Sequence, residues 1–426
     1  MKVKLIIPKW PEGSVWSRFV FRFPYMGVTT LAAIVPPGVE VSIADENVEA
    51  IDFDEGADLV GISALTPLAP RGYEIADAFR KRGAKVAIGG VHATWMPEEA
   101  GEHADCVVIG EAEAIWPRLI EDFKAGALKP RYRASGYPPI GGIPPARMDL
   151  LRGRGYLFKN LIQTTRGCPH DCDFCSVTAL FGKTYRCRPL EDIEAELKAV
   201  RGGAKFVFFV DDNIYGNRSH AKSLLELLKR YPFKWVSQAS VKFADDPELL
   251  KLARETRCHG LLIGFESLSE EGLAAMNKRH NRVEKYKDVI KSLHDHGIGV
   301  HGAFIFGHDE DTKGSFDAVM EFSHKTRLDG GLFSLLTPYP GTRVFEKMKA
   351  EGRLLHTDWR KYDMAHVVFR PKNMSVEELE DGYLRINREF YSWPSMLRRL
   401  PALRRSIFVF GPMNIGLRRL WRGYSY

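Results

Sequence analysis

The sequence predicts an α/β protein with two successive parallel sheets and a helical, basic C-terminal tail. Two sets of short apolar runs alternate with helical patterns, on either side of a Pro/Gly-rich stretch at residues 136–149. Apolar runs separated by helices are typical of parallel strands joined by crossover connections. The 426 residues suffice for two or three domains. We expect a first domain at 1–135, a linker at 136–155, a second domain at 156–345 and a C-terminal region at 346–426.

The first set of elements predicts a doubly wound sheet. Its strands are expected at 2–8, 39–45, 58–65, 85–90 and 105–110, and its helices at 27–35, 71–83 and 113–126. A sheet of this kind binds ligands at the carboxyl ends of its strands. Three loops there contain small residues, namely Ser63, Leu65 and Thr66, then Gly89 and Gly90, then Gly110 with Glu111.

The second set predicts a partial barrel. Strands are expected at 161–165, 205–210, 234–240, 260–266, 297–307 and 332–338, with helices at 190–202, 218–231, 247–257 and 282–297. Six strand–helix repeats are too few for a closed eightfold barrel, but right-handed crossovers would curl them into part of one.

Net charge is concentrated at the C-terminus. The chain carries a formal charge of +7, and the segment after residue 390 has seven arginines without Asp, Glu or Lys. Residues 1–389 are therefore formally neutral, which argues against a general nucleic-acid-binding surface. The arginines are Arg398, Arg399, Arg404, Arg405, Arg418, Arg419 and Arg422.

The location expected from the sequence is the cytoplasm. No apolar run approaches the roughly 20 residues of a membrane span, and the N-terminal apolar stretch is too short for a signal peptide. Six cysteines, three of them clustered, do not resemble a disulfide framework. In a reducing compartment such a cluster more often binds metal.

Cys168, Cys172 and Cys175 form a C-x3-C-x2-C motif after the first strand of the second set. Structural zinc sites usually close with four ligands, and no second cysteine pair is available here. His170 lies inside the loop and would strain it as a fourth ligand. Three thiolates with one open position suit a [4Fe–4S] cluster whose fourth iron takes an outside ligand. A zinc loop and an accidental trio are the alternatives.

The motif, its position and the six repeats resemble the radical S-adenosylmethionine (SAM) superfamily. The resemblance implies that SAM chelates the open iron and is cleaved to methionine and a 5'-deoxyadenosyl radical. It covers about residues 155–345. On the family's pattern, the residues expected to bind SAM are Phe174, Asp211, Asp212, Asn213, Gln238, Gly264 and Glu266. Each of them is also an ordinary loop or capping residue, and helix capping is a serious rival role for Asp212. Arg186 and Arg188 are candidates to pair with a carboxylate.

Together with the barrel, the first domain resembles the cobalamin-binding class of radical SAM proteins, with a Rossmann-like fold. The resemblance implies that Ser63, Leu65, Thr66, Gly89, Gly90, Gly110 and Glu111 bind cobalamin. Classical cobalamin domains have Asp-x-His-x-x-Gly after the first strand–helix unit. Here Asp45 is present, Asn47 replaces the histidine and Ala50 replaces the glycine. Cobalamin is therefore expected without a protein histidine on cobalt, and a vestigial domain is the alternative.

Two further groups are expected to be structural. Cys106, Cys187 and Cys258 lie in different predicted elements and are expected to be core thiols rather than ligands of a second cluster. His294 and His296, at a helix end, are expected to form a surface pair rather than a metal site with His301.

The basic tail has two balanced interpretations. Its arginines and aromatic residues suit a helix docked on the barrel, and they equally suit a segment on an anionic membrane surface, which would place the enzyme at the inner face of the membrane.

The function expected from the resemblance is cobalamin-dependent radical methylation of an unactivated carbon. No catalytic residue is assigned. Radical cyclisation, ring contraction or rearrangement without methyl transfer is the alternative, and a non-catalytic iron–sulfur or cobalamin sensor is the alternative of another class. The tail alone suggests a hydrophobic substrate, such as an isoprenoid lipid or a tetrapyrrole. The implied partner is an electron donor such as flavodoxin or ferredoxin, with no nucleic acid.

Overall fold

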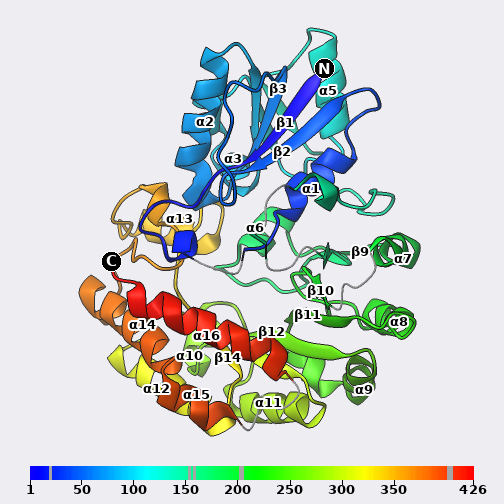
Figure 1. The fold of residues 1–426 in the computed structure, drawn as a ribbon. Coiled ribbons are helices and arrows are strands. Elements are labelled where there is room, and N and C mark those ends of the chain that lie inside the picture. The colour runs from blue at the N-terminus through cyan, green and yellow to red at the C-terminus, as the bar shows by residue number, and fades with distance from the viewer. Residues whose placement is uncertain (19–21, 152–154, 157–159, 201–205, 401–405) are drawn as a thin grey trace. The chain divides into compact units, whose positions relative to one another are not determined.

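The computed structural model describes residues 1–18, 22–151, 155–156, 160–200, 206–400 and 406–426. Arg404, Arg405 and short parts of the predicted linker and of the second domain lie outside these residues. The chain divides into two compact units, drawn in Figure 1. Unit 1 comprises Met1–Lys159, Tyr339–Gly341 and Asp358–Asp363, and therefore continues through the residues predicted as a linker. Unit 2 comprises Asn160–Pro338, Thr342–Thr357 and Met364–Tyr426.

Unit 1 contains the predicted doubly wound parallel sheet, in the strand order β2-β1-β3-β4-β5-β6. All five predicted strands are present, and the sequence analysis missed the short edge strand β6. The strands are β1 (Lys2–Ile7), β2 (Glu40–Asp45), β3 (Leu59–Ser63), β4 (Lys85–Gly89), β5 (Cys106–Ile109) and β6 (Arg131–Arg133). The helices are α1 (Met26–Ala33), α2 (Ala69–Lys81), α3 (Val91–Trp95), α4 (Pro97–His103) and α5 (Trp116–Lys124).

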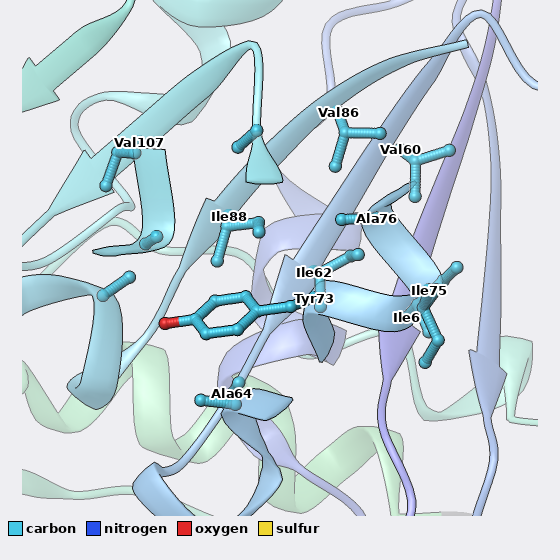
Figure 2. Packing of buried hydrophobic residues seen from close by; sticks show 14 of the residues in the cluster. Ile6, Val60, Ile62, Ala64, Tyr73, Ile75, Ala76, Val86, Ile88 and Val107 are labelled. Carbon is cyan, nitrogen blue, oxygen red and sulfur yellow. The ribbon is translucent and has the colours of Figure 1, made fainter. Parts of the chain in front are cut away.

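Both faces of this sheet are buried because successive residues of each strand point to opposite sides. On one face Ile6, Ile62 and Ile88 pack against α2, including Tyr73 and Ala76, as Figure 2 shows. On the other face, neighbouring strand residues pack against α1 and α5. This burial on both sides explains why the strands are almost continuously apolar.

Two segments from the C-terminal half of the chain also belong to unit 1, which the sequence did not predict. Trp359, in the short helix η6 (Trp359–Lys361), donates its indole N–H to both carboxylate oxygens of Glu99 at 3.0 Å. Asp363 accepts a hydrogen bond from the hydroxyl of Ser14 at 2.6 Å. These contacts, one buried and one partly buried, hold the segment Asp358–Asp363 in unit 1.

Unit 2 contains the six predicted strands in the sequential order β14-β13-β12-β11-β10-β7, all parallel, as expected for a partial barrel. The strands are β7 (Leu161–Ile162), β10 (Phe206–Phe209), β11 (Lys234–Ala239), β12 (Cys258–Glu266), β13 (Gly299–Phe306) and β14 (Gly330–Leu335). The predicted first strand is shorter than expected, because its last residue enters a separate hairpin of β8 (Thr165–Gly167) and β9 (Tyr185–Cys187).

Helices follow the strands of unit 2 and continue into the tail (Figure 1). They are α6 (Ser176–Phe181), α7 (Leu190–Ala199), α8 (Arg218–Leu228), α9 (Pro247–Glu255), α10 (Glu270–Ala275), α11 (Tyr286–Asp295), α12 (Lys313–Thr326), α13 (Arg343–Ala350), α14 (Val376–Phe390), α15 (Trp393–Arg399) and α16 (Ile407–Gly423). Among the helices of the described residues, none is both long enough and apolar enough to cross a bilayer.

The C-terminal helices dock on the barrel through one side. Phe410 of α16 is 3% exposed and lies so close to Gly260 and Gly299 that a Cβ on either glycine would be within 2.8 Å of its ring. Arg399 is buried, and its guanidinium donates to the carbonyls of Leu328 and Phe390. Burial lowers the pKa of Arg399 to about 10. The docking interpretation therefore holds for the inner side of the tail.

Candidate functional site

The three clustered cysteines lie in the loop between β8 and α6 of unit 2. Cys175 is the residue that precedes α6, Cys172 is buried, and Cys168 is half-buried. All three are free thiols. Burial is the main reason that the pKa of Cys172 is raised to about 12, and it also raises the pKa of Cys168. A thiol in this setting becomes a thiolate by binding a metal that replaces its proton.

The outer side of this loop is tied to two other elements. Arg343, at the start of α13, donates to the Asp171 carboxylate at 2.9 Å, to the Asp171 carbonyl at 2.6 Å and to the Asp173 carboxylate at 2.8 Å. Asn277, beyond α10, donates to the Asp171 carbonyl at 2.7 Å, and the Asp173 amide donates to the Met276 carbonyl at 3.0 Å. The loop is thus held in place by contacts that do not use the cysteines.

Asp211, predicted to bind SAM, is fully buried at the end of β10. Its carboxylate accepts four hydrogen bonds, from the amide and the hydroxyl of both Thr164 and Thr165, at 2.5–2.9 Å. Burial raises the pKa of Asp211 to about 6, and the bonds from the two threonines lower it. In the structure this carboxylate connects β10 to the backbone that leads into the cysteine loop.

The two residues after Asp211 also contact the cysteine loop. Asp212 accepts a hydrogen bond from the amide of Gly167 at 2.9 Å. Asn213 donates its side-chain N–H to the sulfur of Cys168 at 3.9 Å, and its side-chain oxygen accepts from the amide of Ser240 at 3.1 Å. Asp211, Asp212 and Asn213 therefore hold the cysteine loop at this strand end. Asp212 does not cap α8, because the N-cap of that helix is Asn217.

The other predicted SAM-binding residues lie at the neighbouring strands. Gln238 is in β11, half-buried, and its carbonyl accepts from the amide of Ile214 at 2.9 Å. Gly264 and Glu266 lie at the carboxyl end of β12, where the register shifts. Phe174, in the cysteine loop, makes an edge contact with His308 at 6.3 Å between ring centres. Adjacent strand ends thus supply oxygen acceptors that suit the ammonium of an amino acid.

Lys278 is a residue of the site that the sequence analysis missed. Its ammonium lies 2.5 Å from the Glu266 carboxylate and 5.8 Å from the centre of the Phe174 ring, and the side chain is buried. Burial lowers the pKa of Lys278, but the charge and hydrogen bond of Glu266 together with Cys172 and Cys175 outweigh it, so the pKa is raised. No periodicity marks this position, since Lys278 follows α10 rather than a strand end. A buried lysine beside a cysteine loop was visible only in three dimensions.

A single metal ion does not fit the described residues, in which no three His, Cys, Asp or Glu side chains converge on one ion. A [4Fe–4S] cluster does not require its cysteines to converge on one point, because each cysteine binds a different iron atom. Three free thiols on one tethered loop, with a buried cation beside them, fit such a cluster in chemistry and in charge.

The remaining candidate residues of unit 2 are engaged in structural contacts. Arg188 does pair with a carboxylate, that of Glu196 at 2.9 Å, and both are buried. His294 pairs with the buried Asp329 at 2.7 Å.

The other three cysteines are in three separate strands. Cys106 is in β5 of unit 1, Cys187 in β9, and Cys258 in β12. Burial is the main cause of a raised pKa for each of them.

The predicted cobalamin-binding residues lie at the carboxyl ends of three adjacent strands of unit 1. Ser63 ends β3, Gly89 ends β4, and Gly110 follows β5. Gly90 has a φ of +97°, and a Cβ there would be 2.8 Å from the Ala64 carbonyl, so only glycine permits this approach of the two loops.

Two polar atoms in α3 add to this edge. His92 Nδ1 and Trp95 Nε1, directly after the Gly89–Gly90 turn, are buried and have no hydrogen-bond partner in the described part of the chain. Such atoms usually have a partner, so their presence fits a polar ligand at this edge.

Asn47 has a structural role at the position where classical cobalamin domains have histidine. Its side chain donates to the Pro8 carbonyl at 3.2 Å and to Asp45 at 2.7 Å, and accepts from the Trp10 amide at 3.0 Å. Asp45 in turn accepts from the hydroxyl of Tyr156 at 2.7 Å. The amide connects the loops after β1 and β2, lacks the imidazole nitrogen of histidine, and its oxygen already accepts the Trp10 hydrogen bond.

Family models match three parts of the chain. The radical SAM superfamily matches residues 162–323, the B12 binding domain matches residues 15–120, and a domain of unknown function matches residues 342–408.

Characterised relatives match across both units. Two proteins of Chlorobaculum tepidum, bacteriochlorophyllide d C-12(1)-methyltransferase and C-8(2)-methyltransferase, are 35% and 32% identical to this chain. Each alignment covers 88% of this chain, and 84% and 87% of the respective relative. Hopanoid C-2 methylase of Rhodopseudomonas palustris is 28% identical, over 79% of this chain and 66% of the relative.

A solved structure has the same fold. It is the cobalamin-dependent S-adenosylmethionine radical enzyme OxsB, with a TM-score of 0.72 and 14% sequence identity. The match covers 91% of this chain and 67% of that one.

Proposed function

This chain belongs to the radical SAM superfamily, in the class with an N-terminal B12-binding domain, and we propose that it methylates an unactivated carbon of a hydrophobic small molecule. The observation that carries the proposal is the 35% identity to a methyltransferase over 88% of the chain, which includes both the B12-type domain and the cysteine loop. The chain is an enzyme, and its family implies a [4Fe–4S] cluster, SAM and cobalamin as cofactors.

We assign the cluster to Cys168, Cys172 and Cys175. When bound, the cluster and SAM supply a 5'-deoxyadenosyl radical that abstracts hydrogen, and cobalamin supplies the methyl group. The protein residues position these groups and exclude water. Asp211, Asp212 and Asn213 hold the loop, while Gln238, Gly264, Glu266 and Phe174 form the surroundings in which SAM would lie.

Cobalamin is assigned to the edge of unit 1 formed by Ser63, Leu65, Thr66, Gly89, Gly90, Gly110 and Glu111. Because Gly90 has no side chain, the loops that contain Gly90 and Ala64 lie close together, and no side chain projects from Gly90 at this edge. The buried nitrogens of His92 and Trp95 remain to donate or accept hydrogen bonds there. The side chain of Asn47 is hydrogen-bonded to Pro8, Trp10 and Asp45. Cobalamin would therefore bind without a cobalt ligand from that position.

The relatives and the composition of the tail support a proposal for the substrate class. The named relatives act on a bacteriochlorophyllide or a hopanoid, so a tetrapyrrole or an isoprenoid lipid is the substrate class we propose for this chain. The electron would come from a small one-electron carrier such as flavodoxin or ferredoxin.

Turnover stoichiometry tests methyl transfer. Methylation of the substrate should consume two SAM molecules, yielding S-adenosylhomocysteine and 5'-deoxyadenosine in equal amounts, and should require added cobalamin. Both products are measured by liquid chromatography with mass spectrometry, using candidate tetrapyrroles and isoprenoids as substrates. Formation of 5'-deoxyadenosine without S-adenosylhomocysteine in the presence of a consumed substrate would instead assign radical cyclisation or rearrangement.

We also propose that the outer side of the tail contacts an anionic lipid surface. Of the nine large apolar side chains exposed in the described residues, six lie between residues 393 and 415. They are Trp393, Leu397, Leu400, Ile407, Phe408 and Ile415, with Phe408 exposed to 78%. Along α16, Phe408, Ile415, Arg419 and Arg422 are spaced by seven, four and three residues and therefore share one face. This outer stripe combines apolar and basic side chains without any acidic residue, as a lipid surface requires.

Only some of the tail arginines are exposed enough to contact lipid, because one side of the C-terminal helices packs against the rest of unit 2. Phe410 is buried against β12 and β13, Trp421 is buried beside Tyr383 of α14, and Arg399 of α15 is 1% exposed. Arg418 lies 5.2 Å from the Trp393 ring centre and is only half-exposed. Arg398, Arg419 and Arg422 are exposed and are the described tail arginines that remain for lipid.

Flotation with vesicles tests this contact. Replacing Arg398, Arg419 and Arg422 with Gln should weaken binding to phosphatidylglycerol vesicles by roughly 3 kcal/mol, at about 1 kcal/mol per arginine. Phe408→Ser should remove a part of the binding that salt does not screen. The matched control replaces the exposed Lys251, Lys291 and Arg118 with Gln, which removes the same charge elsewhere.

Wild-type protein that stays in the unbound fraction at low salt would contradict the lipid proposal. Equal weakening by the control variant would also contradict it, because the effect would then be one of net charge. If the tail variants change the oligomeric state in sedimentation rather than vesicle binding, the stripe is an interface with a second copy of the chain.

A further inference from the structure

Lys278 is a buried cation directed at the three-cysteine loop. Its side chain is 11% exposed, its ammonium contacts the Glu266 carboxylate at 2.5 Å, and it faces the Phe174 ring at 5.8 Å. It interacts electrostatically with Cys168, Cys172 and Cys175. Placing a lysine in such a position costs desolvation free energy, which neighbouring negative charge must offset.

The end of β12 is shaped to hold this pair. A Cβ on Gly264 would be 2.3 Å from the Glu266 carboxylate and 3.0 Å from the Lys278 ammonium, so a larger residue there would have to displace the pair from this arrangement. Glu266 itself has a φ of +66°, in the left-handed region that non-glycine residues rarely adopt. Asn281 holds this backbone by donating to the carbonyls of Gly264 and Phe265 at 3.0 and 3.2 Å. Strain of this kind persists where the surrounding structure imposes it.

Glu266 does not cancel the effect of Lys278 on the loop. Lys278 acts electrostatically on both Cys168 and Cys172, and its effect on Cys172 is larger than that of Glu266. The ammonium of Lys278 lies 5.8 Å from the ring centre of Phe174, between Cys172 and Cys175 in the chain, so the positive end of the pair faces the cysteine loop. In a buried site with a low effective dielectric constant, such an oriented charge acts strongly on its neighbours.

We infer that Lys278 raises the reduction potential of the [4Fe–4S] cluster held by Cys168, Cys172 and Cys175, with Glu266 setting the size of the effect. The inference rests on the cluster ligands assigned above. Reduction adds one electron from an external donor to the oxidised cluster, and no bond forms or breaks. The added negative charge is stabilised by a nearby cation, and hydrogen bonds, net charge and exposure are the factors that set such potentials.

The test is a redox titration of the reconstituted enzyme, with dithionite and mediator dyes, followed by electron paramagnetic resonance of the reduced cluster. Lys278→Met keeps the length of the side chain and removes its charge. At a fixed potential it should lower the ratio of reduced to oxidised cluster about tenfold, equivalent to about 59 mV for one electron. Glu266→Gln removes the opposing charge and should shift the ratio in the opposite direction.

Two control variants separate charge from packing. Lys278→Arg keeps the charge and should titrate close to wild type. Lys242 is an exposed lysine that acts on His170 of the same loop, so Lys242→Met removes a nearby but solvent-screened charge and should leave the potential unchanged. Iron is counted in every variant.

Unchanged potentials in Lys278→Met, or shifts of the same sign in Lys278→Met and Glu266→Gln, would overturn the inference. If Lys278→Met loses its iron, the other two variants test the inference. It then requires a higher reduction potential in Glu266→Gln and a wild-type potential in Lys278→Arg, and any other result would overturn it. A wild-type protein that binds no iron would overturn the proposed function instead, so the two failures are distinguishable.

Discussion

Replacing Cys168, Cys172 and Cys175 together with Ala is expected to abolish iron binding and SAM cleavage. The anaerobically reconstituted wild type should hold about four irons per chain, and the variant close to none. The loop itself should stay folded, because Arg343, Asn277 and Met276 hold it through Asp171 and Asp173 rather than through the cysteines. Iron analysis and the yield of 5'-deoxyadenosine with dithionite measure the two effects.

The matched control replaces the other three cysteines, Cys106, Cys187 and Cys258, with Ala. These thiols lie in three different strands, and the change removes the same number of sulfur atoms. Iron content and SAM cleavage should stay at the wild-type level. Full iron content in the first triple variant, or loss of iron in the control, would refute the assignment of the cluster.

Asp211→Ala is expected to destabilise unit 2 by about 4 kcal/mol and to reduce iron retention. The carboxylate is 0% exposed, and its removal leaves the amides of Thr164 and Thr165 without an acceptor. Each unsatisfied buried donor costs about 1–3 kcal/mol. Because these residues lead directly into the cysteine loop, the loop loses its connection to β10. Urea unfolding followed by circular dichroism, together with iron analysis, measures the effect.

Asp212→Ala serves as the comparison. Asp212 accepts a hydrogen bond from the amide of Gly167, so its removal should cost about 1 kcal/mol. The two variants also test the SAM-binding role that the sequence analysis expects for Asp211 and Asp212. If Asp211→Ala keeps wild-type stability and iron but loses SAM binding in equilibrium dialysis, then Asp211 is a SAM ligand and not a brace of the loop.

The strands were predictable because both sheets are parallel, and the central strands of unit 1 are buried on both faces. Continuous apolar runs such as those of β1 and β3 could therefore be recognised as strands from the sequence. The spacing of the three cysteines likewise indicated the cluster loop. The short edge strand β6 was missed because its three residues, Arg131–Arg133, contain a single buried side chain and show no apolar run.

Other features were not predictable because they depend on contacts between distant residues. Trp359 belongs to unit 1 through Glu99, 260 positions earlier. Lys278 is a functional candidate only through its distance to Glu266 and the cysteine loop. The tail was ambiguous in sequence because α16 has both a buried face with Phe410 and an exposed face with Phe408, which the residue types alone do not separate.

We expect this one chain to hold all the cofactors for cobalamin-dependent radical methylation. The most direct test is to reconstitute the protein anaerobically with iron, sulfide and hydroxocobalamin, remove unbound material by gel filtration, and measure iron, cobalt and the ultraviolet–visible spectrum. The reconstituted protein should contain about four irons and about one cobalt per chain, with absorption from both the cluster and the corrinoid. A protein that retains iron but no cobalt would contradict cobalamin-dependent methylation.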